Sequence, residues 1–247
     1  MNKINKGFVI AFITVLSQWV HAAEQSMDQL MTSRVTSSAK QSKISPKDAL
    51  MRLKAGNQRF LNQKMITRDY LAEAKQSAYG QYPWAVVLNC MDSRSVPELV
   101  FDQGLADLFT LRVAGNVLNT DILGSMEFAT KVAGTRLIVV LGHTSCGAVA
   151  GACAGVQLGH LDQIIDKIKP FVGLSKQKTG LKDCNKPELI NTIAKRNALH
   201  VAEEIQKKSP IIRDLIAKGE IGIVAGMHNI QSGEVTFFEE GRLLPKK

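Results

Sequence analysis

The sequence has few aromatic residues and no long apolar segment after its first 22 residues. Aromatic side chains make up 6% of the 247 residues. No run of lysine and arginine is interleaved with them, which argues against a surface that follows a nucleic-acid backbone. No apolar stretch of about 20 residues follows residue 22, so we expect neither a membrane-spanning helix nor stable membrane association after signal cleavage. The formal net charge of +9 is spread thinly and indicates a solvated surface.

Cysteine is also scarce. If the protein is exported to an oxidising compartment, the four cysteines allow two disulfides, Cys90 with Cys146 and Cys153 with Cys184. We favour metal binding for the first pair, because a bridge would not require His143 three residues before Cys146. Cys153 lies in a run of small residues, where we expect a buried free thiol. A bridge from Cys153 to Cys184 stays open, since sequence does not supply the geometry that a disulfide needs.

Residues 1–22 have the pattern of a secretory signal peptide. Lys3 and Lys6 form a basic start, residues 8–16 an apolar run, and Val20-His21-Ala22 a small-residue cleavage pattern. The apolar run is short for a bilayer span, although an uncleaved anchor is the alternative. We expect cleavage after Ala22 and a periplasmic or secreted protein.

The remaining chain divides into a short leader and one domain. Residues 23–43 are polar and lack periodicity, which predicts a flexible leader. The sequence Ser45-Pro46-Lys47-Asp48 has the cap, proline and acid of a helix start. With 45% hydrophobic residues, residues 44–247 suffice for a single domain with one large core, which we expect to be a zinc-dependent catalytic domain.

Apolar runs alternate with amphipathic segments along this domain, and no internal repeat is evident. This alternation predicts an α/β fold with a mostly parallel central sheet of about five strands and helices on both faces. The expected strands are 85–90, 107–113, 136–141, 221–226 and 235–238. The expected helices are 46–61, 67–78, 97–101, 121–133, 148–155, 161–168, 187–207 and 210–218, and residues 173–187 are expected to form a surface loop.

Two of the expected strands end in metal-binding side chains. One runs directly into Cys90, and another into His143 and Cys146. Parallel sheets bind ligands beyond the carboxyl ends of their strands, where the strand order reverses. If these two strands are neighbours there, the three side chains meet. Two thiolates and one imidazole suit zinc and leave a fourth position for water.

Asp92 and Arg94 follow Cys90 at two-residue intervals. Asp92 could accept a hydrogen bond from solvent on the metal, or it could occupy the fourth metal position itself. A bidentate contact from Arg94 would keep the carboxylate ionised and draw it away from the metal.

Three motifs in combination resemble the signature of the β-class carbonic anhydrases. They are Cys90-Met91-Asp92-Ser93-Arg94, Arg112-Val113-Ala114-Gly115-Asn116 and His143-Thr144-Ser145-Cys146-Gly147, and the similarity runs from about Ser45 to Phe238. The resemblance implies reversible hydration of carbon dioxide to bicarbonate and a proton, by attack of zinc-bound hydroxide. It implies one Zn²⁺ per subunit on the two cysteines and the histidine, the aspartate and arginine as a catalytic pair, and a homodimer or homotetramer.

The resemblance also implies a substrate pocket formed by Gln81, Phe109, Ala114, Gly115 and Phe128. Gln81 corresponds to a glutamine that hydrogen-bonds substrate. Phe109 and Ala114 correspond to apolar wall positions that often face the metal site of a neighbouring subunit, although core packing is the alternative for Phe109. Phe128 stands where many relatives carry tyrosine, so a hydroxyl is missing there.

Two other functions stay open at this level. The same zinc site could hydrolyse carbon disulfide or carbonyl sulfide, because the motifs do not separate these substrates. A structural zinc or redox module that binds a partner is a further alternative, but structural zinc normally has four protein ligands and only three converge here. The sequence does not identify a proton shuttle or distinguish a dimer from a tetramer.

Overall fold

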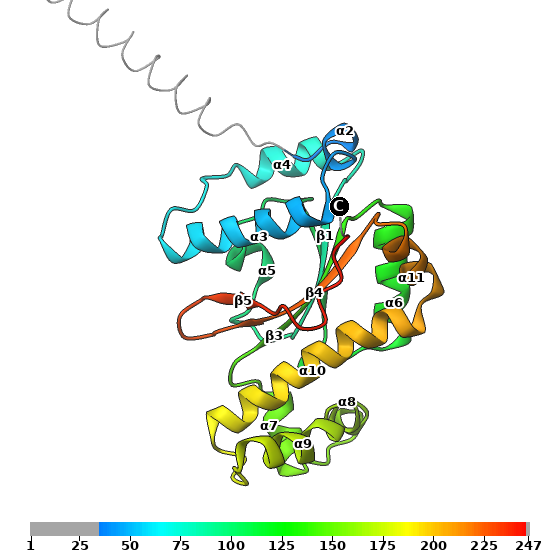
Figure 1. Ribbon diagram of the computed structural model, residues 1–247. Helices are drawn as coiled ribbons and strands as arrows, with labels where there is room; N and C mark the ends of the chain where they lie inside the picture. The colour runs from blue at the N-terminus through cyan, green and yellow to red at the C-terminus, as the bar shows by residue number, and fades with distance from the viewer. Residues whose placement is uncertain (1–34, 246–247) are drawn as a thin grey trace, which may run out of the picture.

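The computed structural model describes residues 35–245, so the expected signal peptide and most of the expected leader lie outside it. A five-stranded sheet with the order β2-β1-β3-β4-β5 forms the centre (Figure 1). The first four strands are parallel, and β5 pairs antiparallel with β4. The strands are β1 (Ala85–Asn89), β2 (Leu108–Arg112), β3 (Leu137–His143), β4 (Gly222–His228) and β5 (Val235–Phe237). The predicted α/β fold is confirmed.

The central strands are buried on both sides because helices cover both faces of the sheet. Every residue of β1 and β3 is buried, which explains their continuous apolar sequence. The covering helices are α3 (Pro46–Leu61) on one face and α6 (Thr120–Glu127), α10 (Pro187–Lys208) and α11 (Pro210–Ala217) on the other. Among the described residues, none of the helices has both the length and the apolar character needed to cross a membrane.

The start of α3 confirms the predicted cap. The Asp48 backbone N–H donates to Ser45 Oγ at 3.1 Å, and the Ser45 backbone N–H donates to the Asp48 carboxylate at 3.2 Å. Pro46 occupies the first helical position, where its missing N–H costs nothing. From this fixed start, Leu50 and Leu53 reach the core under the sheet.

A third group of helices lies at the carboxyl end of the strands, in the lower part of Figure 1. It comprises α7 (Gly147–Ala154), α8 (Leu161–Ile168) and α9 (Pro170–Thr179). These helices and the first half of α10 form an apolar cluster that also contains Cys90 and Cys146. The expected metal ligands therefore lie at the boundary between the sheet and this cluster.

The flexible leader predicted up to residue 43 is wrong for the described part of that segment. Residues Ser38–Gln41 form the short helix α2. The buried side chain of Gln41 donates from Nε2 to the carbonyls of Pro83 and Ala133, both at 2.8 Å. Polar composition concealed this, because the order comes from contacts with distant backbone rather than from apolar burial.

The region between α8 and α10 differs from the expected surface loop. Residues Pro170–Thr179 form α9, so only about half of the predicted loop is irregular. Within that loop Cys184 forms a disulfide with Cys153 of α7, and the expected free thiol at Cys153 is therefore wrong. The bond joins α7 to the segment that leads into α10. The remaining short elements are the helices α4 (Tyr70–Ser77) and α5 (Pro97–Val100), the 3₁₀-helix η1 (Ala114–Asn116) and the π-helix η2 (Phe128–Val132).

Candidate metal centre

Cys90, His143 and Cys146 converge where the strand order reverses. Cys90 directly follows β1, His143 is the last residue of β3, and Cys146 caps α7. Because β1 and β3 are parallel neighbours, their carboxyl ends bring these side chains together. One ligand atom from each residue lies within 4.8 Å of the other two, and the sulfur atoms of Cys90 and Cys146 are 4.0 Å apart. The predicted convergence is confirmed.

His143 has the hydrogen bonding of a metal ligand. Its Nδ1 lies 2.9 Å from the carbonyl oxygen of Thr144, so Nδ1 carries the proton and Nε2 presents a lone pair. Nε2 is buried and has no hydrogen-bond partner among the described residues. A buried nitrogen without a partner is costly, and a cation held between it and the two sulfur atoms would remove that cost. The residues present therefore fit zinc.

The two thiols differ in their readiness to ionise. The hydrogen bond from Cys146 lowers the pKa of Cys90 to about 4, despite burial, and His143 and two backbone groups act in the same direction. The pKa of Cys146 is raised, because its proton is held by Cys90 and the group is buried. The N–H groups of Ala148 and Val149 at the start of α7 oppose that rise. Without a metal, the pair thus shares one proton, which a divalent cation would displace.

Cys90 is also held by the turn that follows β2. The backbone N–H of Gly115 donates to Cys90 Sγ at 3.3 Å. Gly115 has a φ of 66°, and a Cβ there would lie 2.7 Å from Ile168 Cδ1, so any other residue would strain the backbone and displace the Ile168 side chain. Asn197 of α10 fixes the turn by donating to the Gly115 carbonyl at 2.8 Å. Gly115 is therefore placed at the metal centre, and Ala114 directly precedes it in the turn.

Asp92 and Arg94 form the predicted bidentate pair. Arg94 Nε donates to Asp92 Oδ1 at 3.0 Å and Arg94 Nη2 to Oδ2 at 2.8 Å. These bonds hold the pKa of Asp92 well below its usual range. Asp92 Oδ2 nevertheless lies only 3.9 Å from His143 Nε2. Arg112 fixes the backbone of this turn by donating to the carbonyls of Cys90 and Asp92, at 3.2 and 2.5 Å.

Gln81 and Phe109 lie away from the metal ligands of the same chain. Gln81 precedes β1, whereas Cys90 follows it, so β1 separates the two residues. Phe109 pairs in register with Val86, near the amino end of β1. Within one chain, these two expected pocket residues do not meet Cys90.

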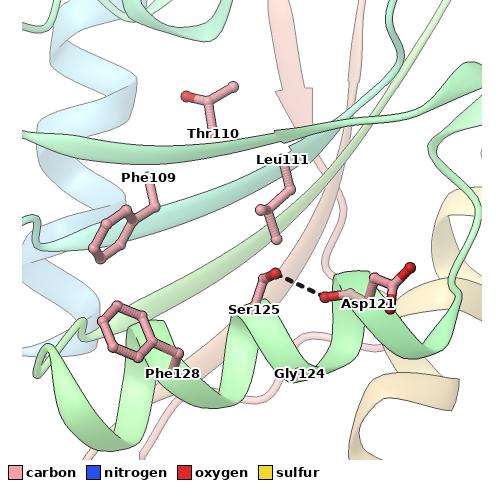
Figure 2. A pocket seen from close by; sticks show the side chains of 7 residues that line it. All are labelled: Phe109, Thr110, Leu111, Asp121, Gly124, Ser125 and Phe128. Carbon is pink, nitrogen blue, oxygen red and sulfur yellow. Dashed lines mark hydrogen bonds between the residues drawn. The ribbon is translucent and has the colours of Figure 1, made fainter.

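Phe109 and Phe128 instead line an open hollow of about 480 Å³ between β2 and α6 (Figure 2). Their rings face each other edge-on with centroids 6.4 Å apart. The remaining lining residues are Thr110, Leu111, Asp121, Gly124 and Ser125. The hollow lies along β2, which is an edge strand of the sheet.

Sequence reasoning missed several polar residues that support this centre. Asn191 Oδ1 accepts a hydrogen bond of 3.0 Å from the backbone N–H of Ser145, which lies in the turn between the ligands His143 and Cys146. Asn197 on the same helix supports Gly115, and the buried Ser95 and His228 contact each other at 2.9 Å. In the sequence, these residues could have been noticed as polar side chains within otherwise apolar segments. Their hydrogen-bond partners could not have been identified, because those partners are brought together only by the tertiary fold.

Comparison with known proteins extends this picture. The family model described as carbonic anhydrase matches residues 85–235. Carbonic anhydrase 2 of Mycobacterium tuberculosis is 34% identical over 194 residues, 76% of this chain and 90% of the relative. The carbonic anhydrase of Mycolicibacterium smegmatis is 36% identical over 199 residues, 77% of this chain and 92% of the relative.

Solved structures support the same fold. The β-carbonic anhydrase CcaA has a TM-score of 0.62 and 24% identity, covering 79% of this chain and 99% of that one. One of two tetrameric β-carbonic anhydrases from Sordaria macrospora matches with a TM-score of 0.60 and 24% identity. That match covers 68% of this chain and 90% of the other.

Proposed function

Because this chain belongs to the β-class carbonic anhydrases, we propose that it catalyses the reversible hydration of carbon dioxide to bicarbonate and a proton, with one zinc ion per subunit. The observation that carries this proposal is the convergence of Cys90, His143 and Cys146, whose ligand atoms lie within 4.8 Å. A zinc ion on these three ligands would have one open position and would supply the Lewis acidity that lowers the pKa of water.

Asp92 and Arg94 are the residues that act on the attacking water. The Asp92 carboxylate is close to the ligand cluster and stays ionised because Arg94 donates two hydrogen bonds to it. Asp92 therefore accepts a hydrogen bond from the water and orients its lone pair towards carbon dioxide. Arg94 holds Asp92 in that role by keeping the carboxylate off the metal position.

We also propose a homodimer in which the β2 edge and the hollow beside it meet a second copy. Among the described residues, β2 pairs only with β1, and an unpaired strand edge readily accepts another chain. Phe128, which lies against Phe109 of this edge strand, has an exposed fraction of 53%. A second copy there would bring Gln81 and Phe109 towards the neighbouring metal site, as the family resemblance implies.

Export to the periplasm or the cell exterior is a further part of the proposal. The disulfide between Cys153 and Cys184 supports it, because such bonds persist in oxidising compartments. Sequencing the amino terminus of the protein from its native cell tests this point. A mature chain that begins at Ala23 is expected, and an intact terminus in the cytoplasm would contradict export.

Stopped-flow measurement of carbon dioxide hydration tests the catalytic proposal. We expect turnover that is fast, rises with pH, disappears when zinc is stripped and returns when it is restored. His143→Ala should lose both zinc and activity, whereas His160→Ala, at an exposed histidine, should lose neither.

Full zinc occupancy without hydration at any pH would overturn the assignment. Carbon disulfide and carbonyl sulfide should be assayed on the same preparation, because the same ligand set would serve their hydrolysis. Activity on these substrates alone would move the chain to that reaction.

A further inference from the structure

A chain of buried polar residues lies behind the turn that carries Asp92 and Arg94. Asn89 and Ser95 have no exposed surface, and His228 has an exposed fraction of 2%. None of the three is a metal ligand or a member of the Asp92–Arg94 pair. Burying polar groups is costly unless they are hydrogen-bonded, so what these groups bind is informative.

The side chains of these three residues are connected by hydrogen bonds. Asn89 Nδ2 donates to the Ser95 carbonyl at 2.6 Å and to Ser95 Oγ at 3.1 Å. Ser95 Oγ lies 2.9 Å from His228 Nδ1, but 3.4 Å from Asn89 Oδ1. A hydroxyl has one proton and two lone pairs, so Ser95 Oγ can bond to Asn89 and to His228 at the same time, in either tautomer of the His228 ring. The series connects the end of β1, through the turn, to the end of β4.

Ser95 also closes the turn that carries the catalytic pair. Its backbone N–H donates to the Asp92 carbonyl at 3.0 Å. The Arg94 backbone N–H donates to Asp92 Oδ1, also at 3.0 Å. The position of Ser95 is therefore transmitted to the Asp92 carboxylate through two short contacts.

His228 reaches the other arm of the metal centre through its backbone. It is the cross-strand partner of His143, and its carbonyl accepts the N–H of Thr144 at 2.9 Å. The Thr144 carbonyl in turn orients His143 Nδ1. His228 thus contacts the β3 arm through its main chain and the Asp92–Arg94 turn through its ring.

We propose that Ser95 and His228 are positioning residues whose hydrogen bond fixes the Asp92–Arg94 turn relative to His143 and keeps Asp92 beside the fourth metal position rather than on it. Asp92 Oδ2 lies 3.9 Å from His143 Nε2, whereas an oxygen and a nitrogen bound to the same tetrahedral zinc would lie roughly 3.3–3.5 Å apart. A small movement of the turn would therefore suffice for ligation. The activity consequence of this inference rests on the proposed function, but the positioning itself does not.

The test compares variants of the hydrogen bond with a matched buried control. Ser95→Ala and His228→Leu remove the bond, whereas His228→Asn keeps a polar acceptor near the position of Nδ1. The control is Ser175→Ala, because Ser175 is fully buried on α9 and its hydroxyl has no partner in the described structure. Each full-length protein is measured with zinc for the pH profile of hydration, and with cobalt for the visible absorption of the metal site.

Ser95→Ala should lower kcat/KM by about ten- to a hundredfold near pH 7. Much of this loss should be recovered near pH 9, because solvent competes better with a carboxylate for the open metal position as pH rises. The cobalt spectrum should change over the same pH range. His228→Asn should retain more activity than His228→Leu, the double variant should be no worse than the worse single variant, and Ser175→Ala should match the wild type.

If Ser95→Ala loses the same fraction of kcat/KM at every pH and its cobalt spectrum is unchanged, the hydrogen bond has only a structural role and the proposal is overturned. Wild-type behaviour of Ser95→Ala would overturn it as well. Absence of hydration by zinc-loaded wild type would instead contradict the proposed function, and the cobalt spectra would still decide the positioning role. If the variants do not fold, nitrogen NMR of the wild type decides: His228 Nδ1 should have the chemical shift of a hydrogen-bonded ring nitrogen, and the shift of a ring nitrogen without a hydrogen bond would contradict the proposal.

Discussion

At the scale of single residues, His228 links the stability of the fold to pH. Burial is the largest of the effects that lower the pKa of His228 to about 4, against about 6.5 in an unfolded chain. Between these two values the unfolded state binds a proton that the folded state does not. The stabilisation is therefore complete above pH 6.5 and is lost as pH falls towards 4.

We predict that the unfolding free energy of the wild type falls by about 2 kcal/mol through His228 when the pH is lowered from 7.5 to 5. The figure follows from the difference between the folded and unfolded pKa values of His228, at 1.36 kcal/mol per pKa unit. The His228→Asn variant should lack that part of the pH dependence, since it has no titrating ring. Urea unfolding of the zinc-loaded proteins at the two pH values measures the difference. His160→Asn, which alters an exposed histidine, serves as the control, and equal pH slopes for His228→Asn and wild type would contradict the prediction.

Sequence reasoning succeeds for residues whose chemistry is local. Cys90, Asp92 and Arg94 lie within five positions of one another, and an adjoining apolar run shows that they follow a strand. Ser95 and His228 are separated by 133 positions, and their contact requires the register of β4 against β3. No local pattern contains that register, so this contact could not be predicted.

At the scale of elements, the disulfide ties the helix of a metal ligand to the rest of the helical cluster. Cys146 is the residue at the N-cap of α7, and Cys153 lies near the other end of that helix. Cys153 forms the disulfide with Cys184, in the loop before α10. The bond closes a loop with a sequence separation of 31. A cross-link of this span stabilises by about 3–4 kcal/mol in the chain-entropy model, and measured values are typically 2–4 kcal/mol.

We predict that the double variant Cys153→Ala/Cys184→Ser loses about 2–4 kcal/mol of unfolding free energy and releases zinc faster to a chelator. Urea unfolding and chelator-exchange kinetics measure the two effects. A genetic change is preferable to a thiol reductant, which itself binds zinc. Unaltered stability together with an unaltered zinc release rate would show that the bond does not support the metal centre.

The elements that sequence analysis misassigned have a common cause. The segment of α9 contains Gly173 and several lysines, which suggested a loop, but Phe171 and Val172 pack against the apolar cluster and stabilise it as a helix. Gln41 likewise orders α2 through two distant carbonyls. In both places tertiary contacts override local propensity.

At the scale of the whole molecule, the β2 edge should join two copies and make activity depend on assembly. We predict that Phe128→Asp, which places a charge at this edge, yields a monomer with much lower hydration activity. The loss is expected because Gln81 and Phe109 could no longer reach a neighbouring metal site. Light scattering coupled to gel filtration, with stopped-flow assays on each fraction, measures both properties.

Leu158→Asp is the matched control, because Leu158 has an exposed fraction of 69% on the segment before α8, and it should change neither property. A monomeric Phe128→Asp with full activity would show that one chain suffices for catalysis. An unchanged dimer would place the interface elsewhere. The sequence indicated an oligomer only through family resemblance, because composition does not reveal which sheet edge stays unpaired.

The 4.0 Å spacing of the two free sulfur atoms also has a kinetic consequence. An oxidant that reaches two thiols this close can convert them to a disulfide, and the thiolate character of Cys90 favours that reaction. In the proposed zinc enzyme, the metal and an oxidant would compete for these two sulfur atoms once β1 and β3 have paired. The order in which they reach the newly folded chain would then decide what fraction of the protein becomes enzyme and what fraction becomes a cross-linked product without a metal site.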